Sequence, residues 1–299
     1  MNAFEPLLRW LPTGWHPQTE ETGDGSGPAR RLAGLLGEEA GAPATLRLGP
    51  LLHYRPFAIA KPDGRERRLL APSPALKRLQ RRLLDRYLAG LPAHPCATAF
   101  GRGASIVRNA RPHARSRLVA TVDLRDFFET TRAARVRAFF AREGWRGEEL
   151  RALLRLCVYR DGLPQGAPTS PWLSNLVNVA LDERLCRLCR RSGAIYTRYG
   201  DDLTFSWSSG GLPGGFQRAV EDHLSGAGYE VQPRKGWLVV PISSRPRVTG
   251  LVLKGDGRLG VPWSLRRRVW CLRCRAWWSA DEGVRARLRG YEGYLRMVD

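Results

Sequence analysis

The sequence predicts a mixed α/β protein of the α+β type, in which antiparallel hairpins are interspersed with amphipathic helices. Three observations predict this class. Two pairs of short strand-like runs flank strong turn sequences, and a longer segment places leucines on one helical face and basic residues on the other. The hairpins are expected at 55–60 with 67–71, around the turn 61–64, and at 196–199 with 203–206, around Gly200-Asp201; the helix is expected at 74–88.

The charge of the chain points to a polyanionic partner. Its 299 residues carry 49 Lys and Arg against 28 Asp and Glu, a net charge of +21. Nucleic acid is the first candidate for such a field, and an anionic membrane surface is the second. No apolar run approaches the length of a spanning helix, and the N-terminus lacks the layout of a secretory signal. We therefore expect a cytoplasmic protein without a membrane partner.

The first part of the chain contains a basic hairpin and a basic helix. Residues 1–50 are the least informative and are treated as an N-terminal extension. The hairpin that follows carries Lys61 and Arg67, which could also be ordinary turn charges. The basic face of helix 74–88 is either solvated or suited to tracking phosphates. A Gly-rich turn at 99–105 then leads into a short helix.

A buried strand is expected at 117–124, and it ends in the carboxylate Asp123. Burying an Asp at the end of an apolar strand is costly unless something positive binds it, so Asp123 is a candidate site residue. Helical stretches follow at 132–142 and 147–159. A Gly/Pro-rich loop at 162–171 opens a long helix expected at 172–191.

The remaining third of the chain begins with the acidic hairpin. Asp201 and Asp202 lie at its tip, where they are either an ordinary surface turn or the ligands of a divalent metal. The elements expected after it are a helix at 215–226, strands at 229–232 and 236–240 flanking Lys235, a hairpin of 248–253 with 259–262, and two helices from 264 to about 297 that interleave Arg and Trp.

Six cysteines are too few for a disulfide scaffold in a chain of this length. Cys186/Cys189 and Cys271/Cys274 have the CxxC spacing that raises the question of zinc. Both pairs lie in helical stretches without the turn residues of a zinc knuckle, so we interpret them as packed thiols.

The three carboxylates define the predicted chemistry. If the strands that carry Asp123 and Asp201-Asp202 are neighbours in one sheet, the three side chains converge. Such a cluster can hold two Mg²⁺ ions about 3.5–4 Å apart. One ion would activate an attacking hydroxyl and the other would stabilise a leaving pyrophosphate, as in a polymerase palm.

Four ordered motifs resemble those of reverse transcriptases, over roughly residues 50–255. They are Val122-Asp123-Leu124-Arg125-Asp126-Phe127-Phe128, Leu163-Pro164-Gln165-Gly166-Ala167-Pro168-Thr169-Ser170-Pro171, Tyr199-Gly200-Asp201-Asp202, and Gly228-Tyr229 through Lys235. Asn109-Ala110-Arg111-Pro112-His113 and Val248-Thr249-Gly250 resemble motifs of the bacterial retron reverse transcriptases. Two positions depart from the family: Gly200 stands where Ala is usual, and Gln232 where Asn is usual.

The resemblance implies a right-hand polymerase with fingers at 51–115, a palm of antiparallel sheet and helices at 116–240, and a small basic thumb at 241–299. It implies that Asp123, Asp201 and Asp202 hold two Mg²⁺ ions, with Mn²⁺ as a substitute. Lys235 would act near the pyrophosphate. The implied nucleotide-binding residues are Lys61, Arg67, Asp126, Phe128 and Gln165. The implied RNA-binding residues are Asn109, His113, Thr249, Arg266 and Arg267.

Phe128 matches a steric-gate position, where a flat ring excludes a 2′-OH and favours dNTPs, although it could also be a plain core residue. The Arg/Trp tail either grips structured RNA or forms an amphipathic core face. The resemblance further implies a structured noncoding RNA as template and primer, a branched RNA–DNA product (msDNA), and a role in antiphage defence beside an effector protein. The alternatives are a group II intron-like or diversity-generating reverse transcriptase, and a catalytically idle RNA-binding protein.

Overall fold

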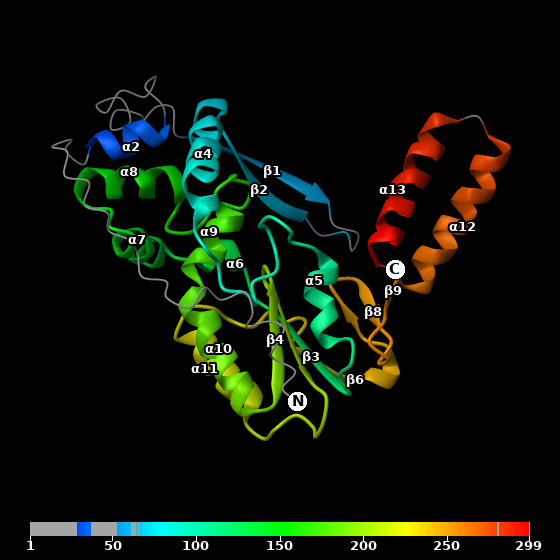
Figure 1. Cartoon of the computed structure of the whole chain (residues 1–299). Coiled ribbons are helices and arrows are strands. Elements are labelled where there is room, and N and C mark those ends of the chain that lie inside the picture. The colour runs from blue at the N-terminus through cyan, green and yellow to red at the C-terminus, as the bar shows by residue number, and fades with distance from the viewer. Residues whose placement is uncertain (1–28, 37–52, 61–63, 65, 280, 299) are drawn as a thin grey trace.

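A computed structural model describes residues 29–36, 53–60, 64, 66–279 and 281–298 (Figure 1). The predicted α+β class is confirmed: helices surround three small sheets, and every strand pair in them is antiparallel. None of the described helices has the length and apolarity needed to span a membrane. Lys61 and most of the predicted N-terminal extension lie outside the described residues.

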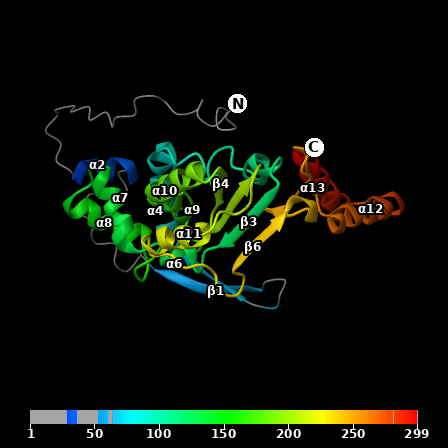
Figure 2. The ribbon, with the colours of Figure 1, turned by 90° about the horizontal axis from the view of Figure 1, so that it is seen from below.

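The central sheet has the strand order β4-β5-β3-β6. Its strands are β3 (Leu118–Asp123), β4 (Ala194–Tyr199), β5 (Asp202–Trp207) and β6 (Trp237–Pro241). Because side chains alternate along a strand, Ala120 and Val122 point to one face, where α10 (Val179–Arg191) and α11 (Phe216–Ser225) cover them. Asp123 and Thr121 point to the other face. Figure 2 shows the sheet with these helices beside it.

A second hydrophobic core lies around α4 (Pro74–Arg86), beside the hairpin of β1 (Tyr54–Ala60) and β2 (Glu66–Pro72). Pro at the first helical turn and Ser73, whose hydroxyl accepts from the Leu76 amide, begin α4 as the sequence predicts. This core also takes in α2 (Ala29–Leu36), α7 (Ala133–Arg142), α8 (Gly147–Cys157) and α9 (Ser170–Val177). The described part of the N-terminal extension, α2, is therefore packed against α4 and α8, where the Leu32 amide donates to Glu149 (2.9 Å).

Two expected elements differ from the structure. The helix expected at 172–191 is divided into α9 and α10 at Asn178, whose side-chain amide donates to the Ser174 carbonyl (2.8 Å) and to the Tyr229 hydroxyl (2.9 Å). These bonds compete with the regular helical ladder. The strand expected at 229–232 is replaced by a single bridge between Val231 and Leu124, because the buried Tyr229 packs inward against Phe127 instead of alternating along a sheet edge.

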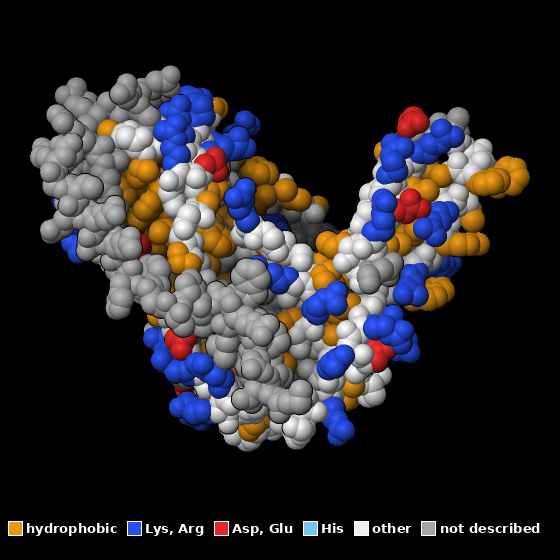
Figure 3. Space-filling view, viewed as in Figure 1, with side chains coloured by type: hydrophobic (Ala, Val, Ile, Leu, Met, Phe, Trp, Pro, Cys, Tyr) orange, Lys and Arg blue, Asp and Glu red, His pale blue; other side chains and the backbone are white. Residues whose placement is uncertain are grey.

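The C-terminal part forms a third core and a projecting helical hairpin. The strand expected at 248–253 is divided into β7 (Arg247–Val248) and β8 (Leu251–Leu253), because Thr249 and Gly250 both have positive φ and turn the chain. The small sheet ends with β9 (Leu259–Gly260). The two tail helices form as predicted, as α12 (Trp263–Trp278) and α13 (Glu282–Val298). Figure 3 shows the molecule hollowed between this hairpin and the region of α4.

The short elements between these bodies connect the three cores. They are η2 (Leu88–Gly90), α5 (Ile106–Ala110), η3 (Arg111–His113), α6 (Phe127–Thr130) and η4 (Ile242–Ser244). Of these, α5 and η3 lie against the central sheet and the small C-terminal sheet, and α6 follows directly on β3.

Candidate active site

The three predicted carboxylates converge at one end of the central sheet. Asp123 ends β3 and Asp202 begins β5, and the two are direct partners in the antiparallel register. Asp201 lies in the tight turn before β5, and its carbonyl accepts from the Leu124 amide (2.8 Å). Directly opposed residues have Cβ atoms about 4.5–5.5 Å apart, so the carboxylates come from adjacent strands to one place.

The electrostatics of this cluster favour a cation. Desolvation, followed by the charges of Asp123 and Asp201, raises the pKa of Asp202 to about 7. Desolvation also raises the pKa of Asp201, to which the neighbouring Asp123 adds. Lys235 approaches closest, with its Nζ 2.7 Å from Asp123 Oδ1, and Arg67 on β2 lowers the pKa of Asp201. Lys235 and Arg67 thus lie beside the predicted cluster.

The loop that carries Gln165 is fixed to the β1–β2 hairpin. The Leu70 amide on β2 donates to the Gln165 carbonyl (2.8 Å). At Gly166, φ is +127° and an added Cβ would lie 2.6 Å from the Leu70 carbonyl oxygen, so only glycine allows this approach. Gln165 itself is partly buried. The loop therefore places Gln165 against the hairpin that carries Arg67.

Phe128 belongs to a row of aromatic rings beside the acidic turn. It is partly buried on α6, and its ring centroid lies 6.1 Å from that of Phe100, which in turn lies 6.5 Å from Tyr199. Phe100 is 42% exposed and has φ +70°, a conformation that non-glycine residues rarely adopt. Sequence reasoning missed Phe100, because nothing in its neighbours signals a positive φ. Asp126, at the start of α6, is exposed and lies 3.5 Å from Arg125 Nε.

A buried ion pair behind the acidic turn was also missed. Arg198 on β4 and Asp182 on α10 are both fully buried and share two contacts, of 2.9 and 2.7 Å. Arg198 also donates to the Gly200 carbonyl (3.2 Å), within the acidic turn itself. Burial opposes the charge of Arg198, but Asp182 outweighs it and raises the arginine pKa. The sequence did offer one signal, since Arg198 lies within a strand of otherwise uncharged residues. The spacing of residues along the sequence did not identify Asp182 as its partner.

Asn109 and His113, which we predicted to contact RNA, are buried in this structure. Both side chains have no exposed surface. His113 Nδ1 lies 2.7 Å from the Ser206 hydroxyl, and Nε2 lies 2.8 Å from the Thr197 hydroxyl. The Thr98 hydroxyl donates to Asn109 Oδ1 (2.7 Å). These residues bind α5 and η3 to the sheet, and their role in this structure is internal.

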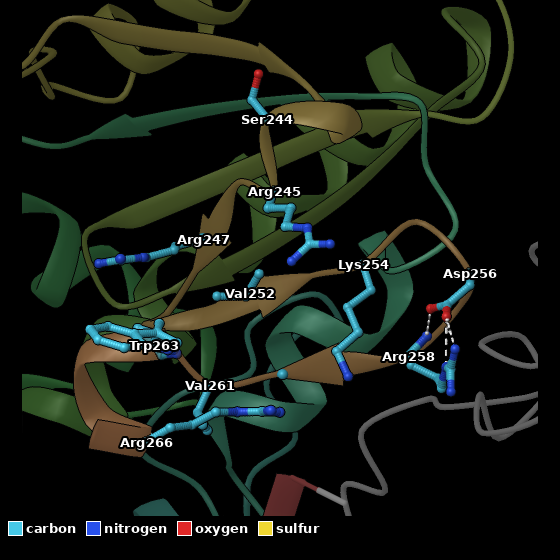
Figure 4. Close-up of a pocket in the computed structure, with 12 residues that line it drawn as sticks. Ser244, Arg245, Arg247, Val252, Lys254, Asp256, Arg258, Val261, Trp263 and Arg266 are labelled. Carbon is cyan, nitrogen blue, oxygen red and sulfur yellow. Dashed lines mark hydrogen bonds and ion pairs between the residues drawn. The ribbon is translucent and has the colours of Figure 1, made fainter. Parts of the chain in front are cut away.

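Thr249 and Arg266 lie in the C-terminal region, where Arg266 lines a basic pocket. The Thr249 hydroxyl donates to the Ile106 carbonyl (3.1 Å), which ties the β7–β8 turn to α5. The pocket has a volume of about 670 Å³ between the small sheet and the start of α12 (Figure 4). Its one acidic lining residue, Asp256, is bonded to Arg258. The other cations that line it are Arg245, Arg247, Lys254 and Arg266.

The helical hairpin of α12 and α13 exposes its tryptophans. Trp263, Trp270, Trp277 and Trp278 are all at least 66% exposed, and the Arg267 guanidinium lies 5.7 Å from the Trp263 ring centroid. Among the described residues of α12, Val269 alone is buried. The tail also has an apolar face that packs on the third core, through Leu265 of α12 and Tyr294, Leu295 and Val298 of α13.

Comparisons with known proteins were made by sequence. No protein-family model matches the chain. It is similar to the retron Mx162 reverse transcriptase of Myxococcus xanthus, with 36% identity over 234 residues that cover 69% of this chain and 48% of that protein. The retron Ec86 reverse transcriptase of Escherichia coli is 35% identical over 210 residues, covering 70% of this chain and 65% of the relative. For the retron Ec73 reverse transcriptase of Escherichia coli the identity is 30% over 229 residues, covering 71% and 72%. The chain thus spans less than two thirds of the length of the Mx162 and Ec86 proteins.

Proposed function

This chain belongs to the retron reverse transcriptase family, and from this premise we propose that it is an RNA-directed DNA polymerase. The observation that carries the proposal is the pairing of Asp123 with Asp202 at the end of adjacent strands, with Asp201 in the turn between β4 and β5. The reaction is nucleotidyl transfer: a hydroxyl at the end of the primer attacks the α-phosphate of a dNTP, and pyrophosphate leaves.

The donor set at this site fits hard divalent cations. All three side chains offer carboxylate oxygens, the ligands that Mg²⁺ and Mn²⁺ prefer, and their mutual repulsion is relieved by positive charge. Asp123, Asp201 and Asp202 would hold two Mg²⁺ ions. When bound, such ions lower the pKa of the attacking hydroxyl and neutralise charge on the phosphates.

The chain's own side chains bind and orient the substrates. Arg67 on β2 would pair with the triphosphate, and Lys61, outside the described residues, is proposed to do the same. Lys235, already within 2.7 Å of Asp123, would stabilise or protonate the departing pyrophosphate. Gln165, Asp126 and Phe128 would line the nucleotide pocket, with the Phe128 ring excluding a 2′-OH.

The partner is proposed to be a structured noncoding RNA that serves as template and primer. Initiation from a 2′-OH of this RNA would give a branched RNA–DNA product. Arg266, Arg267 and the exposed tryptophans of α12 support this proposal, since arginines pair with phosphates and aromatic rings stack on unpaired bases. A role in antiphage defence with an effector protein remains a prediction.

The test separates catalysis from RNA binding. Asp201→Asn with Asp202→Asn should reduce dNTP incorporation on an oligo(dT)-primed poly(rA) template by about a thousand-fold or more, because charge stabilisation at the reacting phosphate is lost. Affinity for the RNA that copurifies with the chain should change by less than about twofold, since the carboxylates do not attract a polyanion. Unchanged incorporation would refute the proposal, and an inactive wild-type chain that binds RNA would favour the idle RNA-binding alternative.

A second arm addresses the RNA surface. Arg266→Ala with Arg267→Ala should weaken binding of the copurified RNA by about tenfold at physiological salt, as two phosphate contacts are removed. Arg285→Ala with Arg287→Ala on α13 removes the same charge from exposed residues and is the matched control. Equal losses in both double variants would mean that net charge, and not this surface, determines the affinity.

A further inference from the structure

A second group of metal-binding side chains lies apart from the acidic cluster, between α10 and the segment that joins η2 to α5. His94 and Cys96 come from that segment, and Cys186 comes from α10. One ligand atom from each of the three lies within 4.8 Å of the others. Cys189, the second cysteine of the same CxxC pair, packs into the core of the central sheet and is not part of the group. The fold has brought distant residues together, which the CxxC spacing did not reveal.

The histidine is oriented as a metal ligand is. Its Nδ1 accepts a long hydrogen bond from the Cys96 amide (3.4 Å) and lies 3.1 Å from Cys96 Sγ, so its lone pair points toward Cys96. A bound ion would replace this amide hydrogen bond. Its Nε2 lies 3.2 Å from Glu183 Oε2, one turn before Cys186 on α10. An imidazole that donates one N–H to a carboxylate and presents its other nitrogen is the usual arrangement in metal centres.

The surroundings allow an ion to enter. The His94 side chain is 16% exposed and Cys186 is partly buried, while Cys96 lies deeper. The group borders a pocket of about 210 Å³, which Arg108, Pro112 and Arg190 also line. A water molecule can therefore reach a fourth coordination position next to the three protein ligands.

We propose that His94 Nδ1, Cys96 Sγ and Cys186 Sγ bind one Zn²⁺ ion, with a water molecule completing a tetrahedron. Imidazole and thiolate are the ligands that zinc takes in such sites, whereas Mg²⁺ prefers oxygen. Each thiol gives its proton to solvent as its sulfur binds, so two protons leave and the ion with its two thiolates is neutral. Glu183 remains outside the coordination sphere and holds the imidazole.

The ion would join three parts of the fold behind the acidic turn. The Arg198 amide on β4 donates to the Cys96 carbonyl (2.8 Å), and the Thr98 amide donates to the Arg198 carbonyl (2.9 Å). Cys186 and Glu183 belong to α10. The proposed site therefore holds segment 94–98, α10 and β4 together. Its contact on β4 is Arg198, two residues before Gly200 in the chain.

The test uses Co²⁺ as a probe for the zinc position in the purified, thiol-reduced full chain. The wild type should bind one equivalent with a thiolate-to-cobalt charge-transfer band and strong tetrahedral ligand-field bands, and Zn²⁺ should displace them. Cys186→Ser and His94→Asn, at partly exposed positions, should each lose the charge-transfer band or weaken Co²⁺ binding by at least about tenfold. Replacing a metal ligand should reduce the affinity at least as much as replacing an outer-sphere partner does.

Two controls make the result specific. Cys271→Ser with Cys274→Ser removes the other CxxC pair, whose thiols are exposed on α12, and should leave the spectrum unchanged. Asp201→Asn with Asp202→Asn should also keep it, because carboxylates give no thiolate band. Absence of the band from the wild type, its survival in Cys186→Ser, or its loss in the α12 control would each overturn the proposal. A wild-type mass that shows a Cys96–Cys186 disulfide after mild reduction would overturn it as well.

Discussion

The central sheet holds charged side chains in two contrasting ways. On the face covered by α10, Arg198 and Asp182 are fully buried and bound to each other through two contacts, so that each charge is balanced within the protein. At the end of the opposite face, Asp123 and Asp202 are only partly buried, and with Asp201 they bring three carboxylates against Lys235. The first arrangement is closed, and the second has excess negative charge.

Whether a group of charges is balanced within the protein distinguishes structural from functional polar groups better than burial alone does. The buried pair keeps the arginine charged, and its removal would leave an uncompensated group in the core. In the acidic cluster, desolvation, followed by the charges of Asp123 and Asp201, raises the pKa of Asp202 to about 7. Lys235 relieves only part of that repulsion, because the pKa of Asp202 stays raised beside it. The acidic cluster is the part of the sheet whose negative charge the protein does not neutralise, so it is where we expect a positively charged ligand to bind.

The largest expected effect comes from opening the closed arrangement. Arg198→Met should lower the free energy of unfolding by about 3–5 kcal/mol, because Asp182 is left buried and unpaired. Urea denaturation monitored by tryptophan fluorescence measures this change. Arg190→Ala is the matched control, since its ion pair with Glu183 is exposed on the same helix as Asp182 and should contribute about 1 kcal/mol or less.

The contrast would be broken if these two variants lost the same stability. A second check is Asp182→Leu in the Arg198→Met background, which removes the stranded charge and should recover part of the loss. Recovery would show that the stranded carboxylate, and not a packing defect, destabilises the single variant. No recovery would assign the loss to packing.

The next effect concerns pH and the buried His113. Burial lowers the pKa of His113 to about 3, while in the unfolded chain a histidine titrates near pH 6.5. As the pH falls below about 6.5, the unfolded state takes up a proton that the folded state does not. The free energy of unfolding should therefore fall, by about 1.7 kcal/mol between pH 6.5 and pH 5.

His113→Asn should lack this part of the acid sensitivity, whatever its stability at neutral pH. Only hydroxyl groups face the two ring nitrogens, Ser206 from β5 and Thr197 from β4, so no neighbouring carboxylate favours the charged ring through direct contact. The measurement is the slope of unfolding free energy against pH, with the exposed His53 replaced by Gln as control. Parallel slopes in the wild type and His113→Asn would contradict the prediction.

Local patterns predicted the exposed arrangement, and only the fold reveals the closed one. Asp123 follows an apolar run and Asp201-Asp202 follow a turn glycine, so their positions at strand ends could be read from neighbouring residues. Their convergence depended on one assumption, that β3 and β5 are adjacent, which the register confirms. The Arg198–Asp182 pair and the burial of His113 depend on how α10 and η3 pack on the sheet. Such packing between distant elements leaves no periodic pattern in the sequence from which it could be predicted.

The same limit explains the misplaced elements. Asn178 lies in an otherwise helical pattern, and its preference for the Ser174 carbonyl and Tyr229 over a regular ladder depends on a contact 51 residues away. Likewise, Thr249 with positive φ divided a segment whose residues favour a strand. The His94, Cys96 and Cys186 group was missed for this reason too, since its members meet only after α10 has packed.

The smallest expected effect tests the turn where the two arrangements meet. Gly200 has φ +68°, its carbonyl accepts from Arg198, and an added Cβ would lie 3.1 Å from Cζ of Phe100. Gly200→Ala therefore combines backbone strain of about 1 kcal/mol with crowding of the Phe100 ring. Gly193→Ala is the matched control, because Gly193 has φ +63° and nothing within 4 Å of the added atom.

The difference between the two alanine variants isolates the contact with Phe100. We expect Gly200→Ala to be about 0.5 kcal/mol less stable than Gly193→Ala in urea denaturation, since Phe100 is 42% exposed and can shift at modest cost. Phe100→Leu in the Gly200→Ala background should remove that difference. Because the displaced ring lies next to Phe128, the ratio of dNTP to rNTP incorporation should change in Gly200→Ala and not in Gly193→Ala. Equal ratios would mean that the acidic turn and the ring beside Phe128 act independently.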